Sequence, residues 1–251
     1  MDNHFIQIDH IRKSFGDQPV FEDVSLHVTK GESIAIIGQS GCGKSVLLKH
    51  ILKLIEPDDG KIEIDGNDLQ KLNESELTAL RRRIGMLFQS AALFDSMTVA
   101  ENVGLGLRES RLYSHDEVMD VVKEKLQMVG LTDAIDKSPA ELSGGMRKRV
   151  GMARAIAGNP ELMLYDEPTT GLDPITSDRI NNLIVDLNDQ LHVTSVTVTH
   201  DLKSASKIAD RIVMLYNGRV QFSGNPQEIQ ATDDPVVRQF IAGSAHGPIQ
   251  V

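Results

Sequence analysis

The amino-acid sequence predicts an α/β protein built around a parallel β-sheet. Three short apolar runs, at residues 162–165, 195–199 and 211–216, are separated by longer segments. A fourth run, "SIAII" at 33–37, is continuously apolar apart from its first residue, as expected of a strand that is buried on both faces of a sheet. Strands that alternate with helical segments indicate a parallel sheet covered by helices.

The N-terminal part of the chain is β-rich. "FIQIDHI" (5–11) and "VSLHV" (24–28) alternate between apolar and polar residues, and "GKIEIDG" (60–66) is a short run bounded by glycines. Near the other end, Asn217 and Gly218 separate the run at 211–216 from "RVQFSG" (219–224), which is a strong hairpin signal. We therefore expect an antiparallel β region in addition to the parallel sheet.

Two segments have the periodicity of helices. "SVLLKHILKLI" (45–55) follows a glycine-rich turn. "HDEVMDVVKEKLQMVGL" (115–131) begins with acidic residues and places Val118, Val121, Val122 and Leu126 on one face. The whole stretch from about 95 to 140 is helical in character, which indicates a helical subdomain.

The composition is that of an ordinary globular protein. The 251 residues carry a net charge of -10, whereas nucleic-acid-binding proteins are more often basic, so we expect no nucleic-acid partner. A single cysteine, Cys42, excludes an intrachain disulfide. The N-terminus lacks the basic and apolar regions of a signal peptide, and no apolar run approaches the ~18 residues that span a bilayer. We expect a cytosolic chain, for which another protein supplies any membrane span.

A phosphate-binding loop is predicted at "GQSGCGKS", which matches G-x-x-x-x-G-K-[ST] between a buried strand and a helix. Glycines let the backbone curl around a phosphate, and the helix N-terminus attracts the anion. Lys44 is expected to reach the β- and γ-phosphates, and the Ser45 hydroxyl to ligate Mg²⁺. The alternative is a plain glycine turn. The residues predicted to contact the nucleotide are Gly38, Gln39, Ser40, Gly41, Cys42, Gly43, Lys44 and Ser45.

Polar residues follow the other apolar strands, where ligands of open α/β sheets bind. Asp166 is expected to hold Mg²⁺, and Glu167 to polarise the water that attacks the γ-phosphate. Gln89 is expected to orient that water or to touch the metal, and His200 to hydrogen-bond the γ-phosphate. Taken singly, Gln89 and His200 are more often structural, but their shared position at strand ends favours a site. A two-metal site at the Asp166–Glu167 pair is the alternative.

The stretch "ELSGGMRKRVGMARA" (141–155) predicts a loop, two glycines and a helix that opens with cations. Cations oppose the positive end of the helix dipole and cost a few tenths of a kcal/mol each. A local rule that is broken without evident gain indicates a functional site, here one that binds an anion. For Arg147, Lys148 and Arg149 the alternative is a solvated basic face.

Taken in chain order, these segments resemble the ATPase subunits of ABC-type transporters. The resemblance covers nearly the whole chain and implies a P-loop NTPase parallel-sheet core with an N-terminal antiparallel β subdomain and an inserted α-helical subdomain. It rests on the phosphate loop, Gln89, "LSGGM" at 142–146, "LMLYDEP" at 162–168, "GLDP" at 171–174 and "THD" at 199–201. The expected boundaries within the single 1–251 domain are 1–90 and 155–230 for the core with its β subdomain, 91–154 for the helical subdomain and 232–251 for a C-terminal tail.

The same resemblance implies that the nucleotide site is completed by a second copy of the chain. Two subunits are expected to dimerise head to tail, with each ATP between the phosphate loop of one and the "LSGG" of the other. Ser143 is the expected N-cap of the signature helix, and Gly144 and Gly145 allow a close approach to the γ-phosphate. Phe15 matches the residue that stacks on adenine, where Tyr is commoner, and Asp173 matches the loop that links the two sites.

A narrower resemblance, to the ATPases of Mla/Mce-type lipid transporters, begins with Met146, where Gln is usual. It also rests on the segments "LFQSAALFDSMTVAENV", "LSGGMRKR", "LDPITS" and "DDPVVRQFIAG". It implies transport of phospholipid or another hydrophobic substrate, driven from the cytoplasmic face of the inner membrane. The expected partners are a membrane permease that contacts the segment after Gln89, an MCE-domain protein and, in some systems, a STAS-domain protein. The tail at 232–251 is expected either to reach the neighbouring subunit or to fray.

Other functions fit part of the sequence. An ATPase of a small-solute ABC transporter would carry the same motifs. A soluble ABC-type regulator usually has two ATPase halves, a coiled coil or a basic extension, and a small-molecule P-loop kinase leaves "LSGGM" unexplained. Cys42, inside the phosphate loop, is either a thiol whose modification ATP blocks or a small filler residue.

Overall fold

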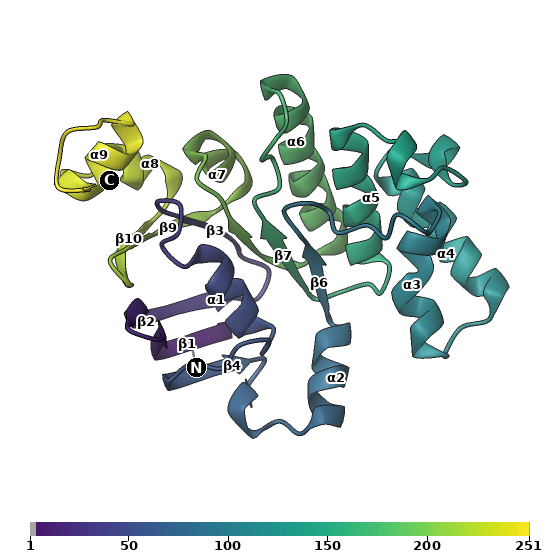
Figure 1. The fold of residues 1–251 in the computed structure, drawn as a ribbon, viewed down its shortest axis with the longest axis horizontal. Helices are drawn as coiled ribbons and strands as arrows, with labels where there is room; N and C mark the ends of the chain where they lie inside the picture. Colours follow the sequence, from purple (N-terminus) through teal and green to yellow (C-terminus); the bar gives the residue numbers. More distant parts are fainter. Residues whose placement is uncertain (1–3, 251) are drawn as a thin grey trace. The chain divides into compact units, whose positions relative to one another are not determined.

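The computed structural model describes residues 4–250, which form two compact units. The first unit comprises residues up to 77 together with those from 194 onward, and the second comprises residues 78–193. Figure 1 labels their helices and strands.

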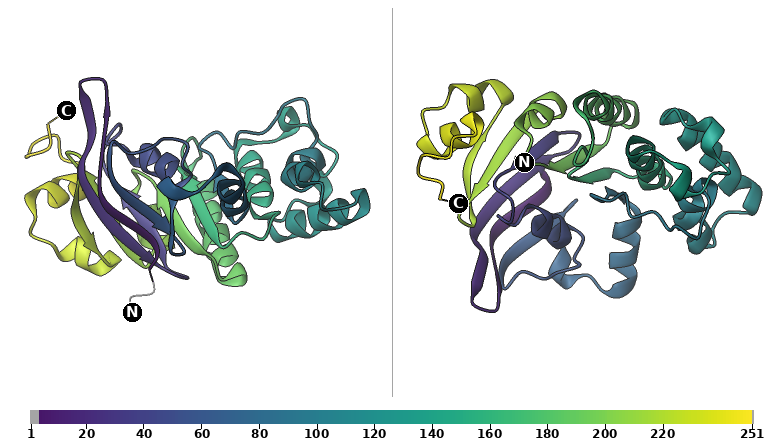
Figure 2. Two further views of the ribbon diagram at one scale, coloured as in Figure 1. Left: turned by 90° about the horizontal axis from the view of Figure 1, so that it is seen from below. Right: turned by 45° about the horizontal axis from the view of Figure 1, so that its top comes forward.

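An antiparallel sheet forms the N-terminal part of the first unit. β1 (His4–Phe15) pairs with β2 (Gln18–Thr29) and with β4 (Asp59–Ile64), and β5 (Asn67–Asp68) pairs with β4. β1 and β2 extend beyond their alternating segments and join through a turn at Gly16, where φ is 58°. Figure 2 shows this pair, in purple, as a long twisted hairpin. The predicted antiparallel β subdomain is confirmed.

The parallel part of the first unit positions the phosphate loop. β3 (Ser33–Ile37) pairs in parallel with β8 (Thr194–Val198) and with β9 (Arg211–Tyr216). β9 then turns back into the antiparallel β10 (Arg219–Gly224), which confirms the predicted hairpin. The helices of this unit are α1 (Lys44–Ile51), α7 (Leu202–Ile208), α8 (Pro226–Ala231) and α9 (Pro235–Ala242), with a short 3-10 helix at Leu69–Lys71.

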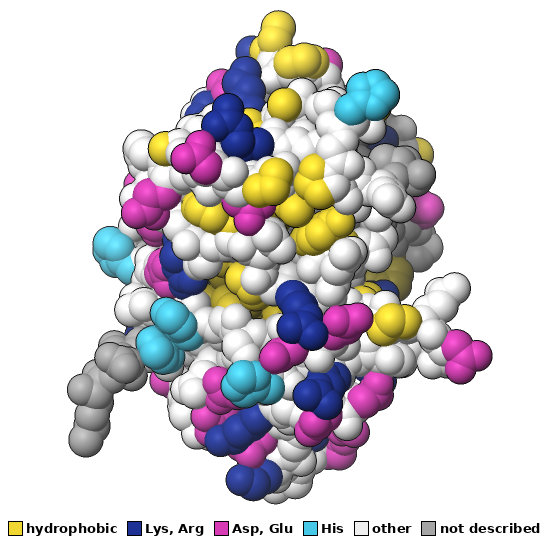
Figure 3. Space-filling model, turned by 90° about the vertical axis from the view of Figure 1, so that its left-hand side faces the viewer, with side chains coloured by type: hydrophobic (Ala, Val, Ile, Leu, Met, Phe, Trp, Pro, Cys, Tyr) yellow, Lys and Arg dark blue, Asp and Glu magenta, His cyan; other side chains and the backbone are white. Residues whose placement is uncertain are grey.

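The C-terminal segment folds back onto its own unit. Ile249 is buried, and its N–H donates to Oε1 of Gln239 at 2.6 Å. Nε2 of Gln239 donates to the carbonyls of Ser244 and Ile249. The hydroxyl of Tyr216 donates to the carbonyl of Pro248. The tail therefore does not fray, at least as far as Ile249. In Figure 1, α8 and α9 lie beside the β9–β10 pair, and Figure 3 shows hydrophobic side chains gathered among charged ones on that side of the molecule.

The second unit combines two parallel strands with a group of helices. β6 (Ile84–Leu87) pairs in parallel with β7 (Leu162–Asp166). Thr98 and Ser114 begin α3 and α4, each with a reciprocal capping box. Figure 1 shows α3, α4 and α5 grouped together. The helices are α2 (Glu74–Arg82, which begins in the first unit), α3 (Val99–Ser110), α4 (His115–Met128), α5 (Gly144–Ile156) and α6 (Pro174–Leu191), with 3-10 turns at Thr132–Ala134 and Pro139–Glu141.

Among the helices of residues 4–250, none combines the length and the apolar character that crossing a bilayer requires.

Candidate nucleotide-binding and hydrolysis site

The phosphate loop connects β3 to α1 in the first unit. Its glycines have positive φ, with values of 153° at Gly38, 81° at Gly41 and 98° at Gly43. A Cβ atom on Gly38 would lie 2.6 Å from the carbonyl oxygen of Leu215 and 2.7 Å from Sγ of Cys42. Only glycine fits there, so the loop keeps a backbone path along which N–H groups can face an anion.

The charges at the start of α1 fit a phosphate ligand. The first turn of this helix holds no acidic residue. Nζ of Lys44 donates to the carbonyls of Gly38 and Gln39, at 2.9 Å each. An ammonium group has three donors, so Lys44 keeps one for a phosphate oxygen while the loop holds its charge in place. Ser45 follows in the first turn of the same helix and is half-buried.

A cavity of about 490 Å³ lies against the phosphate loop. Such a volume is in the range of small-molecule sites. Its lining includes Val20, residues 39–42 and Tyr216. Phe15 is not among the lining residues; it is 47% exposed at the end of β1, with Nζ of Lys13 5.5 Å from the ring centroid. The ring therefore presents an exposed face on which a base can stack.

His200 and Gln89 are both exposed in the loops that follow their strands. His200 comes two residues after the end of β8, next to Asp201, which caps α7. Gln89 comes two residues after the end of β6. His200 belongs to the first unit and Gln89 to the second.

The two carboxylates at the end of β7 have different environments. Asp166, the last residue of the strand, is half-buried, whereas Glu167 is only 9% exposed. Glu167 has a φ of 46°, a left-handed conformation that costs a residue with a side chain about 1–3 kcal/mol in such sites. Oε2 of Glu167 accepts a hydrogen bond from the Thr170 hydroxyl at 3.0 Å. The strain and the fixed carboxylate are typical of a residue held for function.

Lys148 of α5 is a buried cation that binds the backbone next to this carboxylate pair. It is 5% exposed, and its Nζ donates to the carbonyl of Gln89 at 2.6 Å and to that of Glu167 at 3.0 Å. Burial lowers the pKa of Lys148 to about 8, although the charges of Asp166 and Glu167 act in the opposite direction. The alternative of a solvated basic face is therefore wrong for Lys148.

The neighbouring arginines of α5 also bind backbone carbonyls. Arg147 donates to Leu142 at 2.6 Å. Arg149 donates to Val129 at 3.3 Å and to Gly130 at 3.2 Å. The cations of the first turns thus hold the segments that surround the helix start, which explains part of the unusual charge pattern without an anion.

The start of α5 has the predicted cap. Oγ of Ser143 accepts a hydrogen bond from the N–H of Met146 at 3.2 Å, so the N-cap expected at Ser143 is confirmed. Ser143 is exposed and Met146 is half-buried. The two glycines that follow, Gly144 and Gly145, form the first turn.

The signature glycines also pack against the start of α6. A Cβ atom on Gly145 would lie 2.7 Å from Cγ2 of Thr176, and one on Gly144 would lie 3.3 Å from Cδ2 of Leu172. Asp173 is exposed and caps α6, because its Oδ1 accepts from the N–H of Thr176 at 3.0 Å. Hydrogen bonds from Thr176 lower the pKa of Asp173. The structure therefore joins the signature segment to the predicted linking loop within one chain.

The donor atoms that the sequence offers to a metal are hard oxygens. The Ser45 hydroxyl, the Gln89 amide and the Asp166 carboxylate are ligands of the kind that suits Mg²⁺. Within residues 4–250, no group of three or more His, Cys, Asp and Glu side chains is placed to hold a metal ion. The carboxylate cluster that a two-metal site needs is thus not found in that range.

Comparison with known proteins decides the family. A model of the family described as "ABC transporter" matches residues 21–170, well over half of the chain. The chain belongs to the ABC transporter family. The predicted family and fold class are both confirmed.

Relatives of this ABC protein match over nearly its full length. MlaF of Escherichia coli K12, an "intermembrane phospholipid transport system ATP-binding protein", is 43% identical over 234 residues, covering 93% of this chain and 87% of MlaF. The protein of the same name from Haemophilus influenzae is 38% identical over 250 residues, covering 100% of this chain and 95% of its own. The "probable ribonucleotide transport ATP-binding protein mkl" of Mycobacterium leprae is 42% identical over 244 residues, covering 97% and 70%.

Solved structures agree with this assignment. The ATP-binding cassette MJ0796, described as a dimer in a post-hydrolysis state bound to ADP and Pi, has a TM-score of 0.80 and 34% identity. The match covers 88% of this chain and 98% of that one. The protein is thus an ABC ATPase subunit of a transporter, which binds and hydrolyses ATP.

Two residues of the site were not singled out for their roles by the sequence. Lys148 was visible only as a cation in an unfavourable position of the signature helix. Thr170 lies three residues after Glu167, a spacing at which a turn brings a hydroxyl back to a carboxylate. The unfavourable position of the Lys148 cation was informative, but its cause is a pair of hydrogen bonds to the carbonyls of Gln89 and Glu167.

Proposed function

We propose that this ABC ATPase drives the transport of phospholipid or a related lipid, as the nucleotide-binding subunit of a transporter at the cytoplasmic face of the inner membrane. The observation that carries the proposal is the similarity to two MlaF proteins, at 38% and 43% identity over nearly their whole lengths. Met146, which stands in the signature where Gln is usual, supports the same branch of the family.

In the proposed reaction, ATP binds with its phosphates in the loop at residues 38–45. Lys44 offsets phosphate charge, and Glu167 accepts the proton of the attacking water. Thr170 orients the Glu167 carboxylate through its 3.0 Å hydrogen bond. Mg²⁺, held by Ser45, Gln89 and Asp166, would neutralise charge on the β- and γ-phosphates. His200 would hydrogen-bond the γ-phosphate, and Phe15 would stack on adenine.

The chain is proposed to act as a homodimer. Ser143 is exposed at the start of α5, and Asp173 is exposed at the start of α6. Ser143, Gly144 and Gly145 would then meet the γ-phosphate bound to the other subunit, where a helix N-terminus stabilises an anion. The dimeric description of MJ0796, a structural relative, supports this arrangement.

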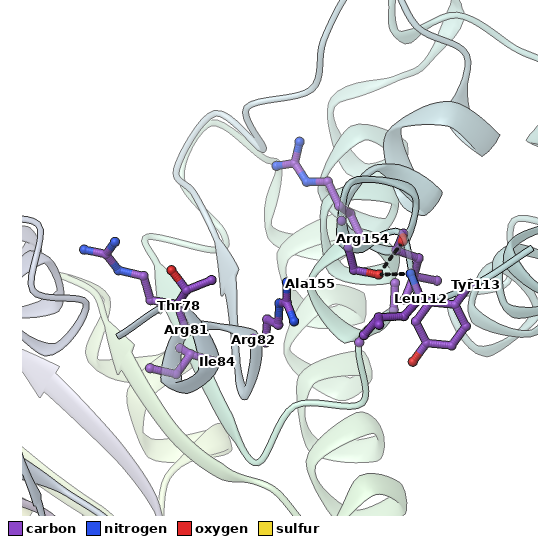
Figure 4. A pocket seen from close by; sticks show the side chains of 13 residues that line it. Thr78, Arg81, Arg82, Ile84, Leu112, Tyr113, Arg154 and Ala155 are labelled. Carbon is purple, nitrogen blue, oxygen red and sulfur yellow. Dashed lines mark hydrogen bonds between the residues drawn. The ribbon is translucent and has the colours of Figure 1, made fainter. Parts of the chain in front are cut away.

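The membrane permease is proposed to dock on the second unit. A cavity of about 520 Å³ there is lined by Leu112 and Tyr113, which are 70% and 45% exposed, and by Arg154. Figure 4 shows Leu112 and Tyr113 on one side of it and Thr78 on the other. The Arg154 guanidinium also donates to the carbonyls of residues 91–92, at 2.7 Å each. These carbonyls lie two and three residues after Gln89, so a partner in the cavity would act close to that residue.

The experiment that tests this proposal is purification of the tagged chain from native membranes in mild detergent. Mass spectrometry should identify an integral permease, an MCE-domain protein and bound phospholipid, with a STAS-domain protein as a further component. A photo-crosslinker at Tyr113 should capture the permease, whereas one at the exposed Gln230 of α8 should not. Recovery of a sugar- or amino-acid-binding protein instead would contradict lipid transport.

A second substrate class has one observation in its favour. The mkl protein of Mycobacterium leprae is named for ribonucleotide transport and is as similar as the MlaF proteins. A small anionic solute is therefore the competing cargo. In the same purified complex reconstituted into vesicles, stimulation of ATP hydrolysis by ribonucleotides rather than by phospholipid would favour it.

A further inference from the structure

We propose that Lys148 is a positioning residue, which holds the catalytic Glu167 and the Gln89 loop in place from the signature helix. It lies five residues after Ser143 on α5. Its ammonium group binds the carbonyls of Gln89 and Glu167, at 2.6 and 3.0 Å. One side chain therefore joins three segments: α5, the loop after β6 and the loop after β7.

The bond to Glu167 acts on a strained residue. Glu167 has a left-handed φ of 46°, and its carbonyl accepts the hydrogen bond from Lys148 at 3.0 Å. Hydrogen bonds from a charged donor are roughly twice as strong as neutral ones, so Lys148 opposes relaxation of this backbone. The same residue has its carboxylate fixed by Thr170 at the other end. Without Lys148, the backbone of Glu167 can return to an ordinary conformation and carry the carboxylate away from the attacking water.

Lys148 supplies a charged donor to both carbonyls. Lys148 is 5% exposed, so its ammonium group has little access to water and depends on these two carbonyls as acceptors. The Glu167 carbonyl also accepts the N–H of Thr170 at 3.3 Å, so loss of Lys148 removes the charged donor and leaves a longer, neutral hydrogen bond. The carboxylates of Asp166 and Glu167 lie close enough to favour the charged form of Lys148. The geometry thus selects a long, flexible cation at this position.

In the proposed homodimer, Lys148 is also placed to couple the two nucleotide sites. In that dimer the start of α5 meets the nucleotide of the partner, while Glu167 acts on the nucleotide of its own chain. A shift of α5 on binding the partner's nucleotide would move Lys148 and, through it, Glu167 and Gln89. Lys148 would then transmit the state of one site to the catalytic residues of the other.

The test compares Lys148→Met with Arg149→Met in the purified full chain. Arg149 is the matched control because it is the next cation of α5 and also binds two carbonyls, which are those of Val129 and Gly130. For Lys148→Met we expect kcat for MgATP to fall about 10- to 100-fold, the range that small misplacements of catalytic groups cause. The Kd for MgATP should stay within about twofold, because the phosphate loop is unchanged. For Arg149→Met, kcat should stay within about twofold at a similar loss of thermal stability.

Two further variants separate positioning from a general structural role. Lys148→Arg keeps a cation and should recover part of the lost kcat. In a Glu167→Gln background, Lys148→Met should cause no further loss of turnover, because the group that it positions is already inactive. The proposal is overturned if Lys148→Met keeps kcat within twofold of the wild type, or if Lys148→Arg has no higher kcat than Lys148→Met. It is also overturned if the kcat losses of Lys148→Met and Glu167→Gln multiply in the double variant. The assay needs neither permease nor lipid, so its outcome is distinct from that of the transport proposal.

Discussion

Replacing His50 with leucine should stabilise the first unit and remove part of its sensitivity to acid. His50 lies on α1 and is 1% exposed, and within residues 4–250 neither of its ring nitrogens has a hydrogen-bond partner. Its ring meets that of Phe21 edge-on, with centroids 5.7 Å apart. A side chain of similar volume without polar atoms should gain about 1–2 kcal/mol at pH 7, since unpaired buried polar groups are costly.

The pH dependence follows from the pKa of His50. Burial lowers this pKa from its ordinary 6.5 to about 4; Lys13 lowers it further, and Asp58 acts in the opposite direction. Because the folded-state pKa is the lower one, the unfolded chain binds the proton more tightly. The stability that the neutral His50 ring contributes is fully present above pH 6.5 and is lost as the pH falls towards 4. Between pH 7 and pH 5 this loss amounts to about 2 kcal/mol.

The assay is urea unfolding followed by circular dichroism, because the chain has no tryptophan for fluorescence. The free energy of unfolding is measured at pH 7, 6 and 5 for the wild type, His50→Leu and His115→Leu, the last at an exposed residue of α4. The wild type and His115→Leu should lose about 2 kcal/mol more than His50→Leu between pH 7 and pH 5. An identical pH dependence in all three proteins would refute the reasoning.

Two smaller predictions concern the tail and the phosphate loop. Gln239→Ala removes three hydrogen bonds to residues 244–249 and should weaken tail docking by about 2 kcal/mol, seen as faster amide exchange there with unchanged exchange in α1; unchanged exchange at Ile249 would show that Gln239 does not hold the tail. Cys42 lines the cavity beside the phosphate loop, so MgATP at 100 times its Kd should slow maleimide labelling about 100-fold, whereas labelling that ignores MgATP would leave Cys42 a filler residue.

Strands were the elements that the sequence predicted best. β3, β9 and β10 match the predicted segments because fully buried runs and an Asn-Gly turn are local signals. β1 and β2 run further than predicted, since their ends protrude as an exposed hairpin in which alternation is lost. Helix α1 ends at Ile51, although the apolar pattern continues to Ile55, because Lys53 adopts a positive φ of 49°.

The candidate site was predictable where a motif states its chemistry, and not where it depends on packing. The phosphate loop and the N-cap at Ser143 are each encoded by residues that are close together in the sequence. The contact between Gly145 and Thr176 joins residues 31 positions apart and has no local signature. Likewise, helical periodicity gives no sign that Lys148 turns inward, because a cation in the first turns is usually solvated. Its partners become visible only once the loops after β6 and β7 are placed against α5.

The central claim, that Glu167 activates water for ATP hydrolysis, is tested most directly by Glu167→Gln. The measurement is steady-state MgATP turnover alongside MgATP binding by the purified chain. The variant should bind MgATP with a Kd within about threefold of the wild type, because its phosphate loop is intact, and its kcat should fall at least about 100-fold, because the general base is lost. Undiminished turnover by Glu167→Gln would contradict the account.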